Sequence, residues 1–201
     1  LGADKGGGSV RGDGVSNRRN QPVQGNATQS PFDDEGAVPL PEAELDRFLM
    51  RFGIGYPSME EELVMLGMLK GIHPIHRVQP VVSAQEVISC QSAVREVHVD
   101  EKVQQYILQI VQDTREHEDI SLGGSPRASI SLMRSGQAMA ALRGRDFVLP
   151  DDIKKVVEPV LRHRLILKPE SRLRRVTAVE IIDDIINSIA VPTVAGEVES
   201  Q

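Results

Sequence analysis

Apolar and polar residues alternate over residues 48–56, which is the period of a β-strand, where every second side chain lies on the same face. The apolar positions are Phe48, Met50, Phe52, Ile54 and Tyr56. Pro41 suits the first position of a helix, so a short helix ending near Arg47 is predicted just before the strand. The pattern therefore predicts that Arg47 lies at a helix-to-strand junction.

From residue 58 onward the apolar residues follow the helical period. Capping boxes, in which an N-cap hydroxyl and an acid three residues later bond each other's backbone, begin at Ser58, Ser83 and Thr177. Asp100, Ser125 and Pro150 are further helix starts. Buried stripes are expected on two helices, at Val103, Ile107, Ile110, Val111, Thr114, Ile153, Val156, Val157, Val160 and Leu161. The sequence predicts a helical bundle over residues 58–192, with Met65 and Met68 in its core and 193–201 as a tail.

Residues 1–26 are rich in Gly and Asn and poor in apolar residues, which favours loop or disorder. The stretch before residue 30, Pro22-Val23-Gln24-Gly25-Asn26, is too polar for a central parallel strand, which is normally a continuous apolar run. The chain begins with Leu1 rather than Met, and on this ground we expect it to be a fragment.

Composition excludes several classes of function. The formal net charge is −6 and aromatic residues make up 3% of the chain, with no Trp, so neither a duplex-binding surface nor a base-stacking platform is expected. No apolar run reaches transmembrane length and no signal-peptide pattern is present, so no membrane insertion is expected. The single cysteine, Cys90, favours a reducing compartment and hence a cytoplasmic protein.

Arg127 is the first candidate for chemistry. It follows Ser125-Pro126 and so falls in the first turn of a helix, where its charge opposes the helix dipole unless an anion is close. A helix N-terminus with an arginine suits a phosphate group. The alternative is that Arg127 points into water or pairs with a carboxylate.

Arg47 is the second candidate, within Leu45-Asp46-Arg47-Phe48. Arginine stabilises the charge on transferring phosphoryl oxygens, and one supplied by a neighbouring subunit can be a large catalytic contribution. The alternative is a surface ion pair with Asp46, which would be worth little. A third candidate is the segment Ala27–Pro31, whose small polar residues could hold an attacking water, although the residues alone favour a loop.

Several motifs are absent from the sequence. There is no GxxxxGK[ST] phosphate-binding loop, no GxSxG, and no apolar strand that ends in adjacent acids suited to Mg²⁺. The five histidines show no metal-ligand spacing and are interpreted as structural or surface residues. These residues by themselves therefore identify no complete catalytic centre.

Taken in order, these segments resemble the MoxR-like AAA+ ATPases from about Val10 to Pro192. The similarity covers Asp13-Gly14-Val15-Ser16, Ala27–Pro31, Glu35-Gly36, Pro39–Pro57, Thr114-Arg115, Leu122–Ala128, Gly144-Arg145-Asp146, Pro150-Asp151-Asp152 and His163-Arg164-Leu165. The resemblance implies a mainly α fold, in which a partial α/β core (residues 27–57) precedes a helical-bundle lid domain. It also implies a hairpin around residues 10–16, and it favours the phosphate roles of Arg47 and Arg127 over their alternatives.

The resemblance implies a role for three residues. Arg47 would be the arginine finger, which reaches the γ-phosphate of ATP on the next subunit. Arg127 would be sensor 2, touching the ATP of its own subunit, and Ser30 takes the sensor-1 place, where the family has Asn. The implied cofactors are ATP and Mg²⁺. The implied assembly is a homo-oligomeric ring, a hexamer, which remodels other proteins and has partners with a von Willebrand factor A domain.

Three alternatives stay open. Without a phosphate-binding loop, the chain alone is not expected to hydrolyse ATP, and it could be a non-catalytic helical module that docks on intact AAA+ subunits or other partners. Within the ATPases, a ring of the magnesium chelatase type or of the replicative helicase type is also open, although the acidic lid and the low aromatic content disfavour the helicase.

Overall fold

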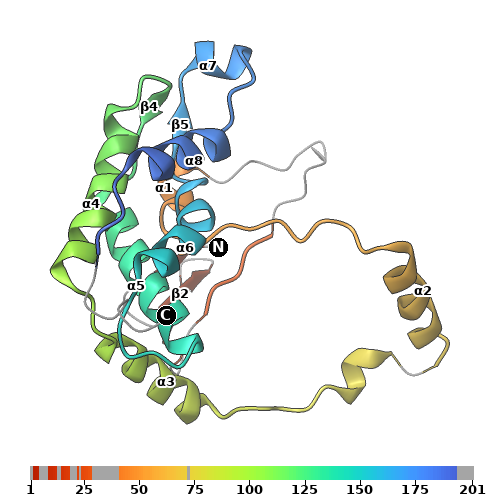
Figure 1. The fold of residues 1–201 in the computed structure, drawn as a ribbon. Coiled ribbons are helices and arrows are strands. Elements are labelled where there is room, and N and C mark those ends of the chain that lie inside the picture. The colour runs from red at the N-terminus through yellow and green to blue at the C-terminus, as the bar shows by residue number, and fades with distance from the viewer. Residues whose placement is uncertain are drawn as a thin grey trace.

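The structure is a computed structural model that describes residues 2–4, 9–12, 15–18, 22, 24–28, 41–71 and 73–193. This part of the chain is mostly helical, as Figure 1 shows, which confirms the predicted fold class. The helices are α1 (Glu42–Leu45), α2 (Met59–Met68), the 3-10 helix η1 (Pro74–Arg77), α3 (Ala84–Glu96), α4 (Glu101–Glu116), α5 (Pro126–Leu142), α6 (Pro150–Leu161), α7 (Pro169–Leu173) and α8 (Ala178–Ser188).

Three short strands occupy part of the N-terminal segment for which the sequence predicted loop or disorder. They are β1 (Gly2–Asp4), β2 (Ser9–Gly12) and β3 (Val15–Arg18), antiparallel in the order β1-β2-β3. β2 and β3 pair from Ser9 with Arg18 to Gly12 with Val15, where the resemblance implies a hairpin. The ladder joins backbone groups and so does not require apolar side chains. Residues 24–28 form no strand and are exposed.

The three predicted capping boxes are confirmed. The backbone N–H groups of Glu61, Glu86 and Glu180 donate to the hydroxyls of Ser58, Ser83 and Thr177, and each glutamate accepts from the backbone N–H of its N-cap residue. Asp100 caps α4 by accepting from the Lys102 N–H at 2.8 Å. These local bonds satisfy backbone N–H groups that a helix start otherwise leaves unpaired. Because the residues that make them are close together in the sequence, the helix starts can be predicted from it.

One hydrophobic core joins α4, α5, α6 and α8, and α3 packs on the outside of α5. Both predicted stripes are buried, with Val103, Ile110, Ile153, Val157 and Val160 each 0% exposed. The sequence pattern did not predict α7 or a two-stranded ribbon of β4 (Ile120–Leu122) and β5 (Ile166–Leu167), in which Ile120 pairs with Leu167. Elements of two to five residues are too short to show a period.

Two segments that resemble lid signatures, Gly144-Arg145-Asp146 after α5 and Pro150-Asp151-Asp152 at the start of α6, meet at a buried carboxylate. Asp152 is 0% exposed and accepts hydrogen bonds from Arg143 at 2.8 Å, from Arg145 at 2.7 and 2.8 Å, and from the Leu149 N–H at 2.9 Å. Burial raises the pKa of Asp152, but the bonds from Arg145 and Leu149 and the two arginine charges outweigh it and lower this pKa overall. Asp152 thus joins the end of α5 to the start of α6.

The strand predicted over residues 48–56 is not formed. The segment is extended, and the Arg51 N–H bonds the Pro159 carbonyl of α6 at 2.8 Å. Gly55 has a φ of +71°, which interrupts an extended conformation. A strand exists only when a neighbour completes its ladder, and the described part of the chain places no strand beside this one. The alternating pattern shows which side chains share a face of the segment, but it does not show whether a second strand lies beside it.

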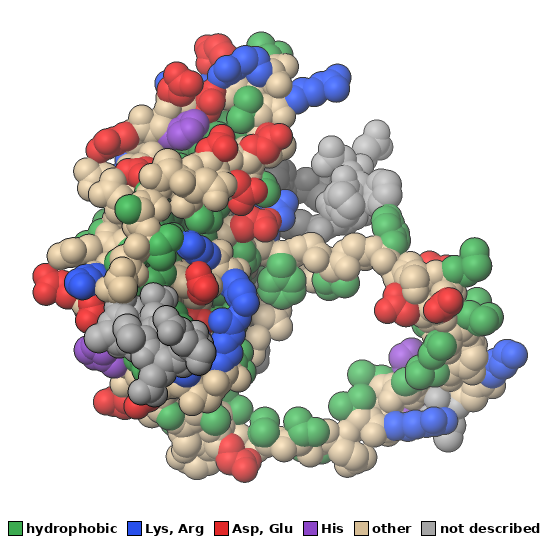
Figure 2. Space-filling view, viewed as in Figure 1, with side chains coloured by type: hydrophobic (Ala, Val, Ile, Leu, Met, Phe, Trp, Pro, Cys, Tyr) green, Lys and Arg blue, Asp and Glu red, His purple; other side chains and the backbone are tan. Residues whose placement is uncertain are grey.

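Beyond residue 51 the chain leaves the bundle as an arm that carries α2 and η1 and returns at α3 (Figure 1). Large apolar side chains line this arm, as Figure 2 shows, and no residue of α2 is buried. The exposed side chains include Phe52, Ile54, Tyr56, Met59, Leu63, Leu66, Val81 and Val82. Met65 and Met68, predicted to lie in the core, are 48% and 57% exposed, so that prediction is wrong. α2 is helical and carries apolar residues as predicted, but it does not pack against the bundle.

The boundaries proposed from the sequence, at residues 27, 58 and 193, stay a prediction. Among the helices that the structure describes, none is both long enough and apolar enough to cross a membrane.

Candidate functional site

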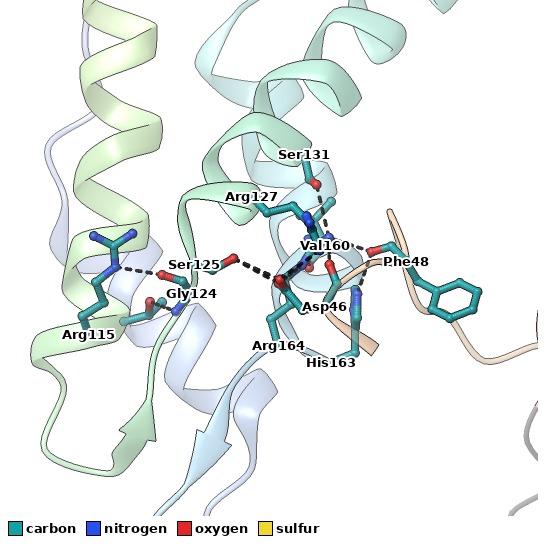
Figure 3. Close-up of polar contacts among 11 residues, drawn as sticks. Asp46, Phe48, Arg115, Gly124, Ser125, Arg127, Ser131, Val160, His163 and Arg164 are labelled. Carbon is teal, nitrogen blue, oxygen red and sulfur yellow. Dashed lines mark hydrogen bonds and ion pairs between the residues drawn. The ribbon is translucent and has the colours of Figure 1, made fainter. Parts of the chain in front are cut away.

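Residues 46–48, which link α1 to the arm, lie against the bundle where α5 begins and α6 ends (Figure 3). Asp46 is the C-cap of α1, and its side chain is 27% exposed. Asp46 and Phe48 are half-buried, whereas Arg47 between them is exposed. Met50 packs on the core, and the Arg51 N–H bonds the Pro159 carbonyl of α6. The segment that carries Arg47 is therefore held by the lid bundle on both sides of that residue.

Asp46 is bound by three side chains from distant parts of the sequence. The Ser125 hydroxyl donates to its two carboxylate oxygens at 3.1 and 3.2 Å. Arg164 Nε lies 3.2 Å from Oδ1, and Arg127 Nη1 lies 3.5 Å from Oδ2. We refer to Asp46, Ser125, Arg127, His163 and Arg164 as the Asp46 cluster.

Arg164 is the buried centre of the cluster, with a side chain that is 1% exposed. Besides Asp46 Oδ1, its guanidinium donates to the Phe48 carbonyl at 2.6 Å, the Val160 carbonyl at 2.6 Å, the Ser131 hydroxyl at 3.1 Å and the Asp46 carbonyl at 3.3 Å. Burial lowers the pKa of Arg164, and the Asp46 carboxylate opposes this effect. Five donors on one planar group suit such a buried hub.

His163 completes the hold on Phe48, because its Nε2 lies 3.1 Å from the Phe48 carbonyl. That distance assigns the proton of a neutral ring to Nε2, since a carbonyl only accepts. Nδ1 is buried and has no hydrogen-bond partner within the described residues. Burial lowers the pKa of His163; the Phe48 carbonyl and Asp46 oppose the shift, and the charges of Arg164 and Arg51 add to it.

The lowered pKa of His163 predicts that acid destabilises the folded chain. The unfolded histidine binds a proton below about pH 6.5, whereas folded His163 stays neutral until its lower pKa is reached. Its contribution is therefore complete above about pH 6.5 and is lost as the pH falls through the folded-state pKa. Urea unfolding at several pH values should show this loss in the wild type and a smaller loss in His163→Gln, which keeps a donor but does not titrate. The same pH dependence in both proteins would contradict the assignment.

The start of α5 differs in one respect from the sequence prediction. Ser125 is the N-cap, but its side chain makes no capping bond and donates to Asp46 instead. The preceding loop is held by the Arg115 Nε, which donates to the Gly124 carbonyl at 2.7 Å, and by Thr114, whose hydroxyl accepts from the Gly124 N–H at 2.9 Å. A Cβ on Gly123 would lie 2.6 Å from the Thr114 carbonyl oxygen, so the close approach of this loop requires glycine. These contacts fix where Arg127 enters α5.

The structure places one sequence-derived candidate, Arg127, beside the residue that precedes a second candidate, Arg47. Arg127, whose side chain is 52% exposed, pairs with Asp46, the residue before Arg47. A carboxylate partner was the alternative considered for Arg127, and that contact is present. The alternative for Arg47 was a surface ion pair with Asp46. The Asp46 carboxylate binds Arg127, Arg164 and Ser125. Ser30 lies outside the described residues.

Sequence reasoning missed the parts played by Asp46, His163 and Arg164. In the sequence, His163-Arg164-Leu165 is recognisable only as a lid signature, because the contacts of His163 and Arg164 with Phe48 span more than 110 positions. The sequence held one partial signal of these contacts: Asp46 is an acidic residue next to an arginine at the end of a predicted helix.

An exposed guanidinium at the start of a helix can bind phosphate oxygens. Within the described residues, no group of three or more His, Cys, Asp and Glu side chains could hold a metal ion. The exposed guanidinium of Arg127 suits an anion.

Comparison with known proteins agrees with this fold. A family model described as an AAA lid domain matches residues 112–185, from the second half of α4 to α8. The chain is 43% identical over 185 residues to the uncharacterised protein YeaC of Bacillus subtilis and 33% identical over 177 residues to the chaperone MoxR1 of Mycobacterium tuberculosis. These alignments cover 92% and 84% of this chain but 58% and 46% of the relatives, so the chain spans about half their length.

A solved structure from Cytophaga hutchinsonii, described as a candidate ATPase, superposes with a TM-score of 0.84 at 32% identity. It is matched over 92% of this chain and 59% of its own. The chain belongs to the MoxR-like AAA+ ATPases, and it comprises a partial α/β core followed by the helical lid domain of that family.

Proposed function

We propose that this chain is part of an ATP-driven, chaperone-like remodelling enzyme, in which Arg47 is the arginine finger and Arg127 is the sensor-2 contact to phosphate. The relative in Mycobacterium tuberculosis named chaperone MoxR1 supports the chaperone class, and the match to the AAA lid model supports the ATPase class. Arg47 would stabilise the charge that develops on the γ-phosphate of a neighbouring subunit's ATP.

One observation carries the proposal. Arg47 and Arg127 lie 80 positions apart in the sequence, yet Asp46 brings the start of α5 to the residue next to Arg47. The exposed Arg127 guanidinium at the start of α5 suits phosphate oxygens, and it lies beside the residue that precedes Arg47. The lid also holds the backbone on both sides of Arg47, because Arg164 bonds the carbonyls of Asp46 and Phe48. A catalytic arginine needs such a fixed position.

The residues in hand fit part of an ATP site. Arg47 and Arg127 can meet phosphate oxygens, but the sequence contains no GxxxxGK[ST] to cradle them. Mg²⁺ would arrive with ATP and neutralise phosphate charge. We propose that the rest of the site comes from a phosphate-binding α/β body at a subunit boundary.

The proposed assembly is a cytoplasmic hexameric ring, with an ATP at each boundary between subunits. Ser30 would orient the attacking water in the place of the family's asparagine, although its hydroxyl reaches less far. Partners with a von Willebrand factor A domain are part of the proposal, and they rest on the family resemblance alone.

ATP turnover tests the proposal. The chain alone should release no phosphate above background. It should restore turnover to intact Bacillus subtilis YeaC in which the residue that aligns with Arg47 is alanine, because this chain would then supply the finger. Robust Mg²⁺-dependent turnover by the chain alone would contradict the need for a second body, and failure to restore turnover would contradict the finger.

The exposed apolar arm favours a second candidate function, a non-catalytic module that docks on intact AAA+ subunits. Phe52 is 74% exposed, Ile54 91% and Leu63 71%, so the arm offers apolar surface that a partner would cover. The same mixture separates the two functions. If the chain co-elutes with YeaC and turnover stays at its unrestored level, the docking function is supported and the catalytic one is not.

A further inference from the structure

Asp46 holds two arginines in very different ways. Arg164 lies 3.2 Å from Oδ1 with a side chain that is 1% exposed, and it makes four further hydrogen bonds. Arg127 lies 3.5 Å from Oδ2 and is 52% exposed. An exposed ion pair is worth about 0–1 kcal/mol, whereas a buried pair is costly to break. The pair with Arg127 is therefore the one that an incoming anion can exchange.

The Asp46 carboxylate also lies where an anion is favoured. It binds the hydroxyl of Ser125, the N-cap of the 17-residue helix α5, and that hydroxyl consequently makes no capping bond. Negative charge is stabilised at this end of a helix. A phosphate that approaches Arg127 would therefore meet a carboxylate that already competes for the same guanidinium.

A change at Asp46 reaches Arg47 without any intervening element. The carbonyl of Asp46 accepts from Arg164 at 3.3 Å, and the Phe48 carbonyl accepts from Arg164 at 2.6 Å and lies 3.1 Å from His163 Nε2. The backbone of Arg47 is thus held between two anchored residues. The side chain of Asp46 also contacts the exchangeable Arg127, so it joins this clamp to the proposed phosphate contact.

We propose that Asp46 is a positioning residue that couples phosphate binding at Arg127 to the placement of Arg47. In the absence of phosphate, Arg127 pairs with Asp46. When a polyphosphate takes Arg127, the Asp46 carboxylate keeps only Arg164 and Ser125, and the backbone at residues 46–48 shifts with it. This inference rests on the proposed function, because it takes Arg127 to be a phosphate contact.

The test is a titration of the full chain with sodium tripolyphosphate, followed by the NMR signals of the Arg127 side-chain Nε–H and of the Arg47 and Phe48 amides. The wild type should show all three shifting with one midpoint. Arg127→Gln leaves the pair of Asp46 with Arg164 intact, and it should abolish the response at residues 47 and 48. Arg172→Gln, a change at an exposed arginine on α7, should leave the response unchanged.

Asp46→Asn sharpens the test, because it removes the competing charge and keeps the shape. Tripolyphosphate should then bind Arg127 up to about fivefold more tightly, which is what the loss of an exposed pair of up to about 1 kcal/mol allows. Coupled shifts in the wild type that vanish in Arg127→Gln support the inference even if this variant fails to fold.

The outcomes that overturn the proposal differ from each other. If the Arg127 signal shifts while those of Arg47 and Phe48 stay in place, the coupling is wrong and the phosphate role of Arg127 stands. If residues 47 and 48 respond equally in Arg127→Gln, the response does not pass through Arg127, and the coupling is again wrong. If no signal of Arg127 moves, the phosphate role in the proposed function fails, and the coupling fails with it.

Discussion

Replacing Arg47 by alanine is expected to abolish the turnover that the chain restores to finger-deficient YeaC, with a loss of about a thousandfold or more. An arginine finger is worth about 10³–10⁵ in turnover, because its guanidinium neutralises charge that appears on the phosphoryl oxygens in the transition state. Steady-state phosphate release by the mixed assembly measures the effect. Because Arg47 is exposed, the substitution should leave the fold of the chain unchanged.

Arg51→Ala is the matched control for Arg47→Ala. Arg51 is an exposed arginine four positions along the same segment, and its bond to α6 is made by its backbone N–H, which alanine retains. Its turnover should stay close to that of the wild type. If Arg47→Ala and Arg51→Ala lower turnover equally, the effect belongs to the charge of the segment, and Arg47 is not the finger.

Replacing Arg164 by methionine is expected to lower the free energy of unfolding by about 3–5 kcal/mol, the range for breaking a buried ion pair from one side. The substitution leaves the Phe48 and Val160 carbonyls without the donors that bond them at 2.6 Å, and it removes the buried partner of Asp46. Methionine roughly fills the volume, so most of the loss comes from unpaired polar groups. Urea unfolding followed by circular dichroism measures it.

The control for this variant is Arg162→Met, two positions earlier. Arg162 makes an exposed pair with Glu158 at 3.1 Å, with side chains that are 38% and 44% exposed. Such a pair is worth less than about 1 kcal/mol, so the loss of stability should be small. Equal losses in the two variants would show that the Asp46 cluster is not a buried hub.

The lid domain could be predicted in large part because its signals are local. The capping boxes at Ser58, Ser83 and Thr177 are bonds within four residues, and the buried stripe of α6 is a period within one helix. Such features require no knowledge of what surrounds the helix. The order of the segments then indicated the family, and the comparisons confirm it.

The predictions that failed depend on a neighbour. Residues 48–56 alternate as a strand does, yet no strand forms, because the described residues offer no partner ladder. Met65 and Met68 are apolar and helical, yet α2 lies outside the bundle. In both cases the pattern shows which side chains avoid water, but it does not show which element or partner covers them.

The starts of the lid helices, their buried faces and the candidate arginines can be read from the amino-acid sequence, since propensity, capping and periodicity act over a few residues. The folded chain was needed to find that Asp46 lies between Ser125, Arg127 and Arg164, and that His163 and Arg164 bond the Phe48 carbonyl. These contacts span about 80 to 118 positions. Their geometry is set by how α5 and α6 pack, and no local pattern records that packing.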